Sequence, residues 1–443
     1  MKLRRRLGTL DVALVTIGGV IGSGIFRTPS VVARDLGTPV AILGAWALGG
    51  IVSLLGALVL GELAARRPLD GGLYAYLRDA FHPALAFVFG WMLLFIAMSG
   101  GAASAAIAFA GYAAPVLGIA STPMILGALA TAAVLLFTAI NAFGVRAGTN
   151  TQNGFLIAKI LAFALFVVVA LVAPHAPTAP VAAAAPEPSL GLLGVAMLPV
   201  LFSYLGWGPG TYVSAEIRDP VRALPRGLAL GVLGVTAIYV AINAVLIHAL
   251  GIVGLSATTT PVADVARVAF GPIAERIVGA VVALSLLGFV SNQLLTAPRV
   301  YYQMGVDGLF FRAFAKLDPR TGAPIFAIVI QAVIVVALTL SRSYDQLLNY
   351  ITSADFLFLM LAGIALFIIR ARDARDLAPQ PYMKIPLHPY STALFTAIAF
   401  SIVAGALYKA PVDTLIGWGI IATGLPVYAI FSARKRSRGD DPA

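Results

Sequence analysis

Residues 18–26 read GGVIGSGIF and lie in the middle of the first long apolar run of the sequence, at about residues 10–36. A run of this length can cross a hydrocarbon core of about 30 Å as a helix. Each glycine inside a helix destabilises it by about 1 kcal/mol relative to alanine, and here Gly22 and Gly24 flank a serine. The stretch therefore predicts a membrane-spanning helix that is interrupted at Gly22-Ser23-Gly24.

A second interruption is predicted five spans later, at GWGPG (residues 206–210). Pro209 removes a backbone donor and its ring clashes with the preceding turn. Unwound backbone at membrane depth is tolerated only where it is buried in protein or lines a polar cavity. Two interrupted spans at equivalent positions of two halves indicate a transporter built from inverted repeats, with its binding site at the breaks. For the first span alone, the alternative is a packing face of small residues.

The composition agrees with a membrane protein, because 60% of the 443 residues are hydrophobic and 11% are charged, against about 25% charged in soluble domains. We predict an all-α membrane protein that forms a single transmembrane transporter domain over residues 1–443. Repeat one covers about residues 10–173, repeat two about 190–370, and two peripheral helices about 391–432. The twelve predicted spans lie at about residues 10–36, 39–65, 83–116, 122–142, 152–173, 190–217, 226–252, 273–303, 322–341, 345–370, 391–409 and 412–432.

Lysine and arginine gather in alternate loops, starting with the N-terminal segment at residues 2–6. By the positive-inside rule, both termini are expected in the cytoplasm of a protein of the cell (inner) membrane. The lipid bilayer therefore accounts for the net charge of +11 better than a nucleic-acid partner does, and no nucleic acid is expected. The chain has no cysteine, which excludes thiolate metal sites and a disulfide-linked partner.

The breaks have a chemistry that suits a small zwitterion. A broken helix exposes backbone groups that its own hydrogen bonds would otherwise use. Free amides near Ser23 to Phe26, at the positive end of a half-helix, suit a carboxylate. Carbonyls near Ile17 to Ile21 and Leu201 to Tyr204 suit an ammonium group. No metal site and no cofactor are predicted.

Two charged residues lie inside predicted spans. Lys159 lies in the fifth span, between apolar runs, and Asp355 lies in the tenth. Charges at such positions are costly and usually functional. Snorkelling to the interface is the alternative for Lys159. Asp355 has three alternatives: pairing with a basic group, carrying a coupled proton, or facing a water-filled vestibule.

The motifs at these positions resemble the amino acid-polyamine-organocation superfamily, and within it the L-type amino acid transporter family. The resemblance rests on GGVIGSGIF (Gly18 to Phe26), GELAARRPLDGGLYAYL (Gly61 to Leu77), TQNGFLIAK (Thr151 to Lys159), FSYLGWGPGTYVSAEIRDPVRALPR (Phe202 to Arg226) and TAPRVYYQMGVDGLF (Thr296 to Phe310). It implies a LeuT-like fold, with a 5+5 inverted repeat, broken helices 1 and 6 and two peripheral helices. It also implies that the breaks hold the carboxylate and ammonium of an amino acid.

Individual roles also follow from the resemblance. Phe202 matches an aromatic gate over the substrate, and Trp207 the tryptophan after the glycine of span 6. Lys159 matches a lysine that replaces a sodium ion, and Tyr239 a tyrosine near it. The predicted substrate-binding residues are Ile21, Gly22, Ser23, Gly24, Ile25, Phe202, Ser203, Leu205, Gly206 and Trp207.

The resulting prediction is a sodium-independent secondary transporter of small or medium neutral L-amino acids that works by exchange through alternating access. Leu205 stands where the family often has a smaller residue, which favours small substrates. The alternatives are a proton-coupled amino acid or polyamine symporter and an amino acid sensor that does not transport. Catalysis is not expected, because the four histidines lie near span ends and share no spacing.

Overall fold

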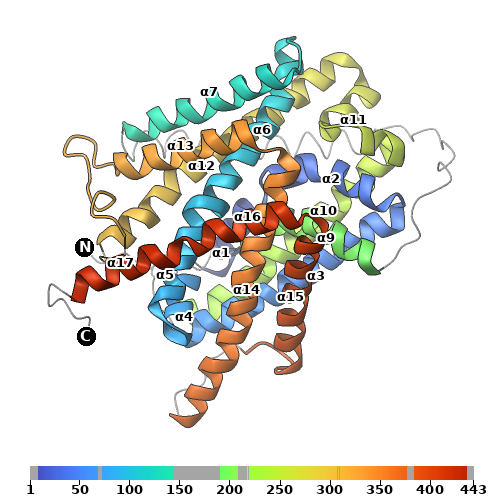
Figure 1. The fold of residues 1–443 in the computed structure, drawn as a ribbon. Helices are drawn as coiled ribbons and strands as arrows, with labels where there is room; N and C mark the ends of the chain where they lie inside the picture. The colour runs from blue at the N-terminus through green and yellow to red at the C-terminus, as the bar shows by residue number, and fades with distance from the viewer. Residues whose placement is uncertain are drawn as a thin grey trace. The chain divides into compact units, whose positions relative to one another are not determined.

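A computed structural model describes residues 8–67, 72–143, 190–207, 217, 219–306, 308, 310–376 and 384–436 (Figure 1). The regular elements of these residues are helices. They are α1 (Thr9–Val20), α2 (Ser23–Leu36), α3 (Pro39–Arg66), α4 (Leu73–Ala80), α5 (Pro83–Met92), the π-helical turn η1 (Leu93–Ala97), α6 (Met98–Leu117), α7 (Pro123–Ala142), α9 (Leu190–Tyr204), α10 (Pro220–Ala257), α11 (Pro261–Phe270), α12 (Pro272–Val306), α13 (Ile325–Ser341), α14 (Tyr344–Arg375), α15 (Tyr390–Lys409), α16 (Pro411–Ala422) and α17 (Gly424–Arg436).

Eight helical segments in the described residues are long and apolar enough to cross a membrane, and the bent pair α1 and α2 makes a ninth. Two further predicted spans correspond to shorter helices, α9 with 15 residues and α13 with 17. The predicted span at 152–173 lies outside the described residues. Large apolar side chains point away from the protein along these helices, with Val40 83% and Met124 84% exposed, as expected of surfaces that face lipid.

Local sequence signals set the helix ends. Proline opens α3 and α7, and the preceding Thr38 and Thr122 cap them by accepting hydrogen bonds from first-turn amides. Gly37 and Gly118 end α2 and α6 in the left-handed conformation that glycine adopts without strain. These signals explain why the predicted and observed boundaries agree closely.

The chain forms two compact units. The first consists of Met1–Ala86, Pro180–Ile247 and Thr352–Val412, and the second of Phe87–Ala179, His248–Ile351 and Asp413–Ala443. The first unit thus takes in α1 to α4 from the first predicted repeat and α9 with most of α10 from the second. The second unit takes in α6 and α7 from the first predicted repeat and α12 and α13 from the second. Each unit therefore combines segments from both halves of the sequence.

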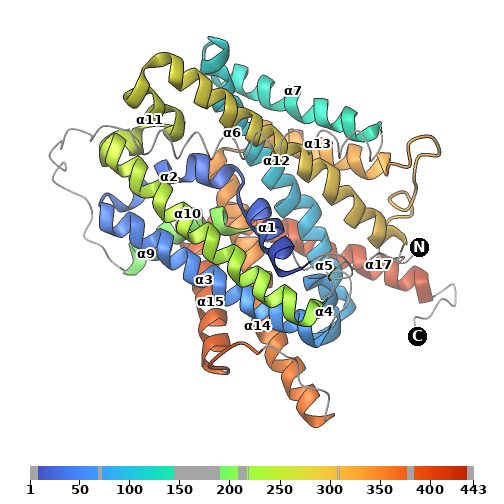
Figure 2. The ribbon, with the colours of Figure 1, turned by 180° about the vertical axis from the view of Figure 1, so that it is seen from behind.

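In the first unit, glycines let the helices approach closely. A methyl group on Gly227 of α10 would lie 2.5 Å from Val12 Cβ, and one on Gly231 would lie 2.6 Å from Thr16 Cβ, so α10 packs directly on α1 (Figure 2). Gly49 of α3 meets α9 in the same way, where the methyl group would lie 2.5 Å from Val200 Cγ1. Small residues at helix contacts are typical of membrane bundles, whose association depends on close packing.

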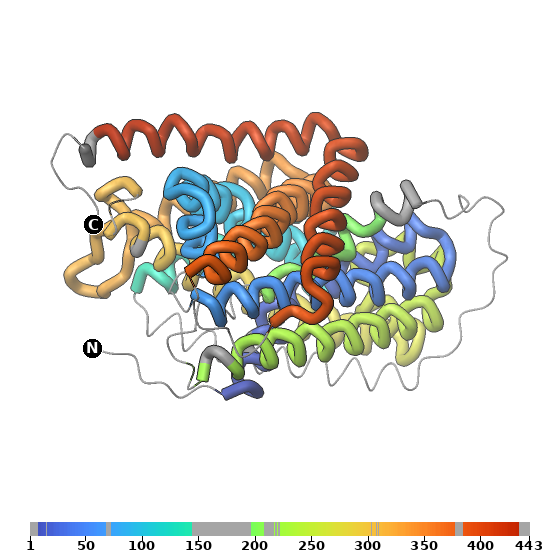
Figure 3. The backbone as a smooth tube through the Cα atoms, turned by 90° about the horizontal axis from the view of Figure 1, so that it is seen from below, coloured from blue at the N-terminus to red at the C-terminus, as the bar shows by residue number. Residues whose placement is uncertain are grey.

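The second unit is built around α6, which packs against α7, α12 and α13. Gln331 of α13 donates from Nε2 to the carbonyl of Gln293 in α12, at 3.3 Å. Phe310 lies 5.8 Å, between ring centroids, from both Phe87 and Trp91. Figure 3 shows α16 and α17 following one another along one line.

A buried network of charges joins one end of α3 to α14 in the first unit. Glu62 accepts hydrogen bonds from Arg66 at 2.8 Å and from Arg370 at 2.6 Å, and Asp373 accepts from Arg66 at 2.7 Å. The side chains of Glu62, Arg66 and Asp373 are only 1%, 2% and 4% exposed. These contacts brace the end of α3 against α14.

Arg67 extends this network to α4. Its guanidinium lies 2.7 Å from Asp373 and 2.9 Å from Asp79 of α4. Burial lowers the pKa of Arg67, but hydrogen bonds to Asp373 and Asp79 outweigh it and raise the pKa above its usual value. Glu62 also accepts a hydrogen bond from the amide of Ile385, which precedes α15, at 2.7 Å.

Candidate functional site

The first predicted interruption is present. Helix α1 ends at Val20, α2 begins at Ser23, and the two helices are bent by 54°. Ile21 adopts an extended conformation with φ −71° and ψ 94°, and Gly22 is the residue before the first turn of α2. The helix therefore breaks at Ile21 and Gly22, one residue before the centre of the predicted Gly-Ser-Gly cluster.

The span that begins with α9 also stops being helical inside its apolar run. Helix α9 ends at Tyr204, and Leu205 to Trp207 are not helical. Gly206 has φ +109°, a conformation that strains residues with a side chain. The rest of the predicted interruption, residues 208–210, lies outside the described residues.

The two interruptions touch each other within the first unit. A methyl group on Gly19, in the last turn of α1, would lie 2.6 Å from the carbonyl oxygen of Gly206, and one on Gly206 would collide with the Gly19 carbonyl. A methyl group on Gly24 would lie 2.6 Å from Ser203 Cα, so the first turn of α2 lies directly on the last turn of α9. The absence of Cβ atoms at these positions allows the half-helices to approach at the breaks.

Tyr239 joins the carbonyl ends of the two broken helices. Its hydroxyl lies 3.2 Å from the Val20 carbonyl oxygen at the end of α1 and 3.1 Å from that of Ser203 near the end of α9. The final carbonyls of a helix have no partner inside it, and a buried carbonyl without a donor is costly. A hydroxyl has one hydrogen, so Tyr239 can donate to one of the two carbonyls at a time.

The amide end of α2 has no side-chain cap. Gly22 occupies the capping position and offers no acceptor, unlike Thr38 before α3 and Thr122 before α7. The first-turn residues Ser23, Gly24 and Ile25 are buried. The positive end of α2 therefore lies inside the protein at the break, where it can accept an anionic group of a ligand.

The other predicted residues lie around these helix ends. Phe202 and Ser203 are 9% and 1% exposed in the last turn of α9, and Leu205 is half-buried after it. Trp207 is 3% exposed, and its ring packs where a methyl group on Gly56 of α3 would lie 2.9 Å away. Ile21 is 4% exposed. Lys159 lies outside the described residues, so its predicted position near Tyr239 stays a prediction.

Sequence reasoning did not find two aromatic residues that support Tyr239. Trp46 of α3 and Tyr204 of α9 lie 5.4 Å and 5.1 Å from the Tyr239 ring, between centroids. The Tyr204 hydroxyl donates to the Trp46 carbonyl at 2.8 Å. The only signal in the sequence was a tryptophan and a tyrosine inside apolar spans. Their contact with Tyr239 depends on how α3, α9 and α10 pack, and the hydrophobic periodicity of the sequence does not reveal that packing.

Asp355 lies in the part of α14 that belongs to the first unit. Thr352, one turn earlier, donates to the Leu198 carbonyl of α9 at 3.3 Å, so this face of α14 packs against α9 one turn before Phe202. Asp355 is half-buried, and it forms no ion pair with the residues that the structure describes. A carboxylate in such a place remains a candidate functional group.

Comparison with known proteins identifies the family. The family model for amino acid permeases matches residues 7–432. The chain is 29% identical to the serine/threonine exchanger SteT of Bacillus subtilis, with 98% of each chain covered. It is 28% identical to the b(0,+)-type amino acid transporter 1 of Mus musculus, with 97% of this chain and 88% of the relative covered. It is also 28% identical to the human large neutral amino acids transporter small subunit 2, with 96% of this chain and 80% of the relative covered.

The relatives are transporters and not enzymes, and their match extends over nearly the whole chain. The resemblance noted from the motifs is thereby confirmed at the level of the superfamily. Together with the apolar helices and the interrupted pair, the match shows a multi-pass membrane protein whose substrates are amino acids. The chain belongs to the amino acid permease family, within the amino acid-polyamine-organocation superfamily.

Proposed function

We propose that the protein is a sodium-independent exchanger of small or medium neutral L-amino acids that works by alternating access. The observation that carries the proposal is the meeting of three half-helix ends: the carbonyl ends of α1 and α9 and the amide end of α2, where glycine occupies the capping position. Opposite partial charges lie side by side there, without a charged side chain from the predicted binding residues. A zwitterion is complementary to this arrangement.

In the proposed complex, the substrate carboxylate accepts hydrogen bonds from first-turn amides of α2, at Ser23 to Ile25. The ammonium donates to carbonyls at the ends of α1 and α9, where Tyr239 now bonds to Val20 and Ser203. Tyr239 would then keep these carbonyls in place between turnovers. Phe202 closes over the substrate as a lid and excludes water.

Substrate size follows from the space near Leu205. Its side chain is larger than the residue that the family often has there, and it lies half-buried beside the break. This favours small side chains. The exchanger among the relatives carries serine and threonine in its name, which supports both exchange and small substrates.

Sodium independence rests on Lys159 and Tyr239. If Lys159 matches the family lysine, its ammonium group would lie where related transporters bind sodium and would make a bound cation unnecessary. A fixed positive charge there would repel sodium by about 1 to 4 kcal/mol at 4 Å, depending on the local dielectric constant.

We also propose the twelve-span LeuT-like architecture, a location in the cell membrane and cytoplasmic termini. The two interrupted helices and the way both compact units draw on both predicted repeats support this architecture. In transporters of this kind, one group of helices rocks against the other around a central site.

Proton-coupled symport is the second candidate function. It is favoured by one observation, the half-buried Asp355 inside α14, one turn from the contact with α9. A carboxylate at membrane depth can carry a proton through the transport cycle.

The test measures uptake of a panel of labelled amino acids into proteoliposomes, both with and without unlabelled amino acid inside. The sodium gradient and the proton gradient are set independently. We expect uptake of small neutral amino acids from preloaded vesicles and little uptake into empty ones, with no response to sodium. Uptake into empty vesicles driven by a proton gradient and abolished by Asp355→Asn would establish symport instead. Acceleration by a sodium gradient would refute sodium independence.

A further inference from the structure

A cavity lies in the second unit. It has a volume of about 230 Å³ and is lined by the end of α6, the start of α11 and the first two turns of α12. This volume is below the range of about 300–1,000 Å³ of pockets for drug-sized ligands. The cavity therefore suits a group of a few heavy atoms.

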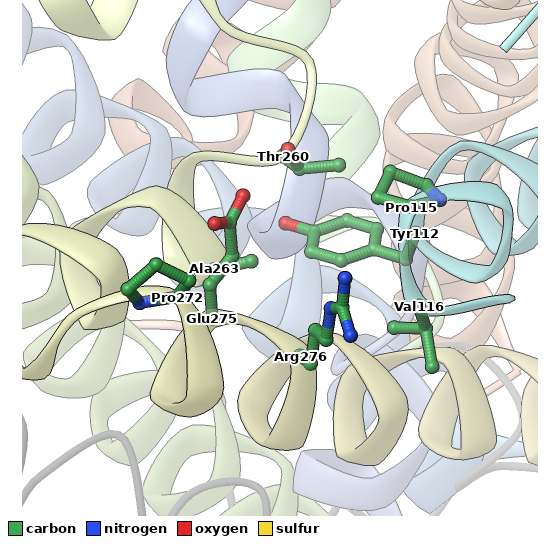
Figure 4. A pocket seen from close by; sticks show the side chains of 9 residues that line it. Tyr112, Pro115, Val116, Thr260, Ala263, Pro272, Glu275 and Arg276 are labelled. Atoms are coloured by element: carbon green, nitrogen blue, oxygen red, sulfur yellow. The ribbon is translucent and has the colours of Figure 1, made fainter. Parts of the chain in front are cut away.

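Opposite charges line this cavity. Figure 4 shows the Glu275 carboxylate pointing toward the Tyr112 hydroxyl and Thr260, with the Arg276 guanidinium beside the Tyr112 ring. Tyr112 is 1% exposed, so its hydroxyl has a fixed place in the wall. Helices α12 and α6 pack tightly at the cavity, because a methyl group on Gly279 of α12 would lie 3.1 Å from Val116 Cγ2 of α6.

The charged groups of Arg276 and Glu275 can each form hydrogen bonds with a ligand. Arg276 is exposed and forms no ion pair with the part of the chain that the structure describes. Glu275 lies 3.9 Å from Arg267, which is too long for a hydrogen bond, and Arg267 also pairs with Asp264 at 3.6 Å. An anionic group at Arg276 would also be favoured by the positive end of α12.

The surroundings of the cavity are apolar and exposed. Ile273 and Ile277 of α12 are 76% and 53% exposed, Leu117 at the end of α6 is 61% exposed, and Phe270 is 52% exposed. In a membrane protein such side chains contact acyl chains. Arg276 and Glu275 lie at the start of a long apolar helix, which corresponds to headgroup depth, on the side predicted to be outside.

We propose that this cavity binds the headgroup of an outer-leaflet phospholipid that carries a primary ammonium group. The phosphate pairs with Arg276 and the ammonium donates to Glu275, while the acyl chains lie along Ile273, Ile277 and Leu117. A phosphatidylethanolamine headgroup carries both an anionic phosphate and a primary ammonium group. A phosphatidylcholine headgroup has no ammonium hydrogen to donate, and phosphatidylglycerol has no cation.

The experiment is native mass spectrometry of the full-length protein in detergent, titrated with phosphatidylethanolamine, phosphatidylcholine or phosphatidylglycerol of the same chains. The wild type should retain phosphatidylethanolamine about tenfold better than phosphatidylcholine. A ratio of this size is what the loss of one partly exposed charge-assisted hydrogen bond produces. Glu275→Gln should remove this preference. Arg276→Gln should weaken retention of all three lipids by about tenfold, and Arg276→Lys should restore part of it.

Arg342→Gln is the control, because Arg342 is a half-buried arginine of the second unit that pairs with Asp413 at 3.9 Å and lies outside the cavity. It should leave lipid retention unchanged. Equal retention of the three lipids by the wild type, or equal losses in Arg342→Gln and Arg276→Gln, would overturn the proposal. So would binding of free serine or O-phosphoethanolamine as tight as that of the lipid, because the site would then hold a soluble zwitterion. None of these outcomes depends on the mode of transport.

Discussion

At the scale of single residues, the Tyr239 hydroxyl holds two helix ends through one hydrogen atom. Tyr239→Phe removes the donor and leaves the carbonyls of Val20 and Ser203 without it. We expect the free energy of unfolding to fall by about 1–3 kcal/mol. Exchange should slow by about tenfold at subsaturating substrate, because the carbonyls proposed to hold the ammonium lose their fixed position. Initial rates in proteoliposomes measure the second effect.

Tyr408→Phe provides the control for this prediction, since Tyr408 belongs to the same unit and is 86% exposed. It should leave both the stability and the exchange rate unchanged. If Tyr239→Phe matched Tyr408→Phe in both measurements, the hydroxyl would have no role at the breaks.

Gly24 permits a close approach between α2 and α9. In Gly24→Ala, the new methyl group would lie 2.6 Å from Ser203 Cα, so backbone has to move. Overpacking of this kind costs about 1–3 kcal/mol. We expect transport to fall by more than about tenfold, measured as exchange in vesicles that contain equal amounts of protein, because the amide end of α2 shifts away from the carbonyl ends.

Gly18→Ala is the matched comparison, because no atom lies within 4 Å of the position of its new methyl group. Alanine is also the better helix former, by about 1 kcal/mol. We expect this variant to transport at the wild-type rate with equal or higher stability. Equal losses in both variants would show that glycine matters for reasons other than the contact with Ser203.

At the scale of elements, the charge network ties α3, α4 and α14 together at one end of the first unit. Glu62→Gln removes one charge from a network whose side chains are mostly buried and leaves Arg370 without its partner. Breaking a buried ion pair in this way costs about 3–5 kcal/mol. Equilibrium unfolding of the purified protein in detergent should show a loss of this size.

An exposed carboxylate supplies the comparison for this network. Asp219 lies 3.7 Å from Arg222, and both side chains are more than half exposed. Asp219→Asn should therefore cost less than about 1 kcal/mol, because exposed pairs contribute little. A similar small loss in Glu62→Gln would mean that α14 is held by packing and not by charge.

The helices themselves show which elements were predictable. Proline and threonine at the starts of α3 and α7, and glycine at the ends of α2 and α6, mark boundaries that chain chemistry imposes locally. The short helices α4 and α11 and the π-helical turn η1 inside the third span were not predicted. They lack a long apolar run, or lie within one, so hydropathy does not distinguish them.

At the scale of the whole molecule, the predicted topology can be tested because the chain has no cysteine. A single cysteine at Ser121, exposed between α6 and α7, should react with a membrane-impermeant maleimide in intact cells. A single cysteine at Arg320, exposed between α12 and α13, should react only after the cells are opened. The reverse pattern would place the termini outside, against the distribution of lysine and arginine.

By itself, the sequence determined the membrane class, the position of almost every described span, a break of the first span close to Gly22 and the family. These properties depend on hydropathy and on the conformational limits of glycine and proline, which act within a few neighbouring residues. Glycine clusters alone did not distinguish a ligand site from a packing face at Gly24, and the structure shows that the backbone at Ser203 lies against it.

Only the tertiary structure decided that the two breaks touch at Gly19 and Gly206, that Tyr239 bridges Val20 and Ser203, and that Asp373 completes the network of Glu62. These contacts join residues that lie far apart in the chain. Their pairing depends on which helix faces meet, and in an apolar span nearly every face has the same composition. Packing of small residues therefore selects the neighbours, and this selection is visible only once the helices are assembled.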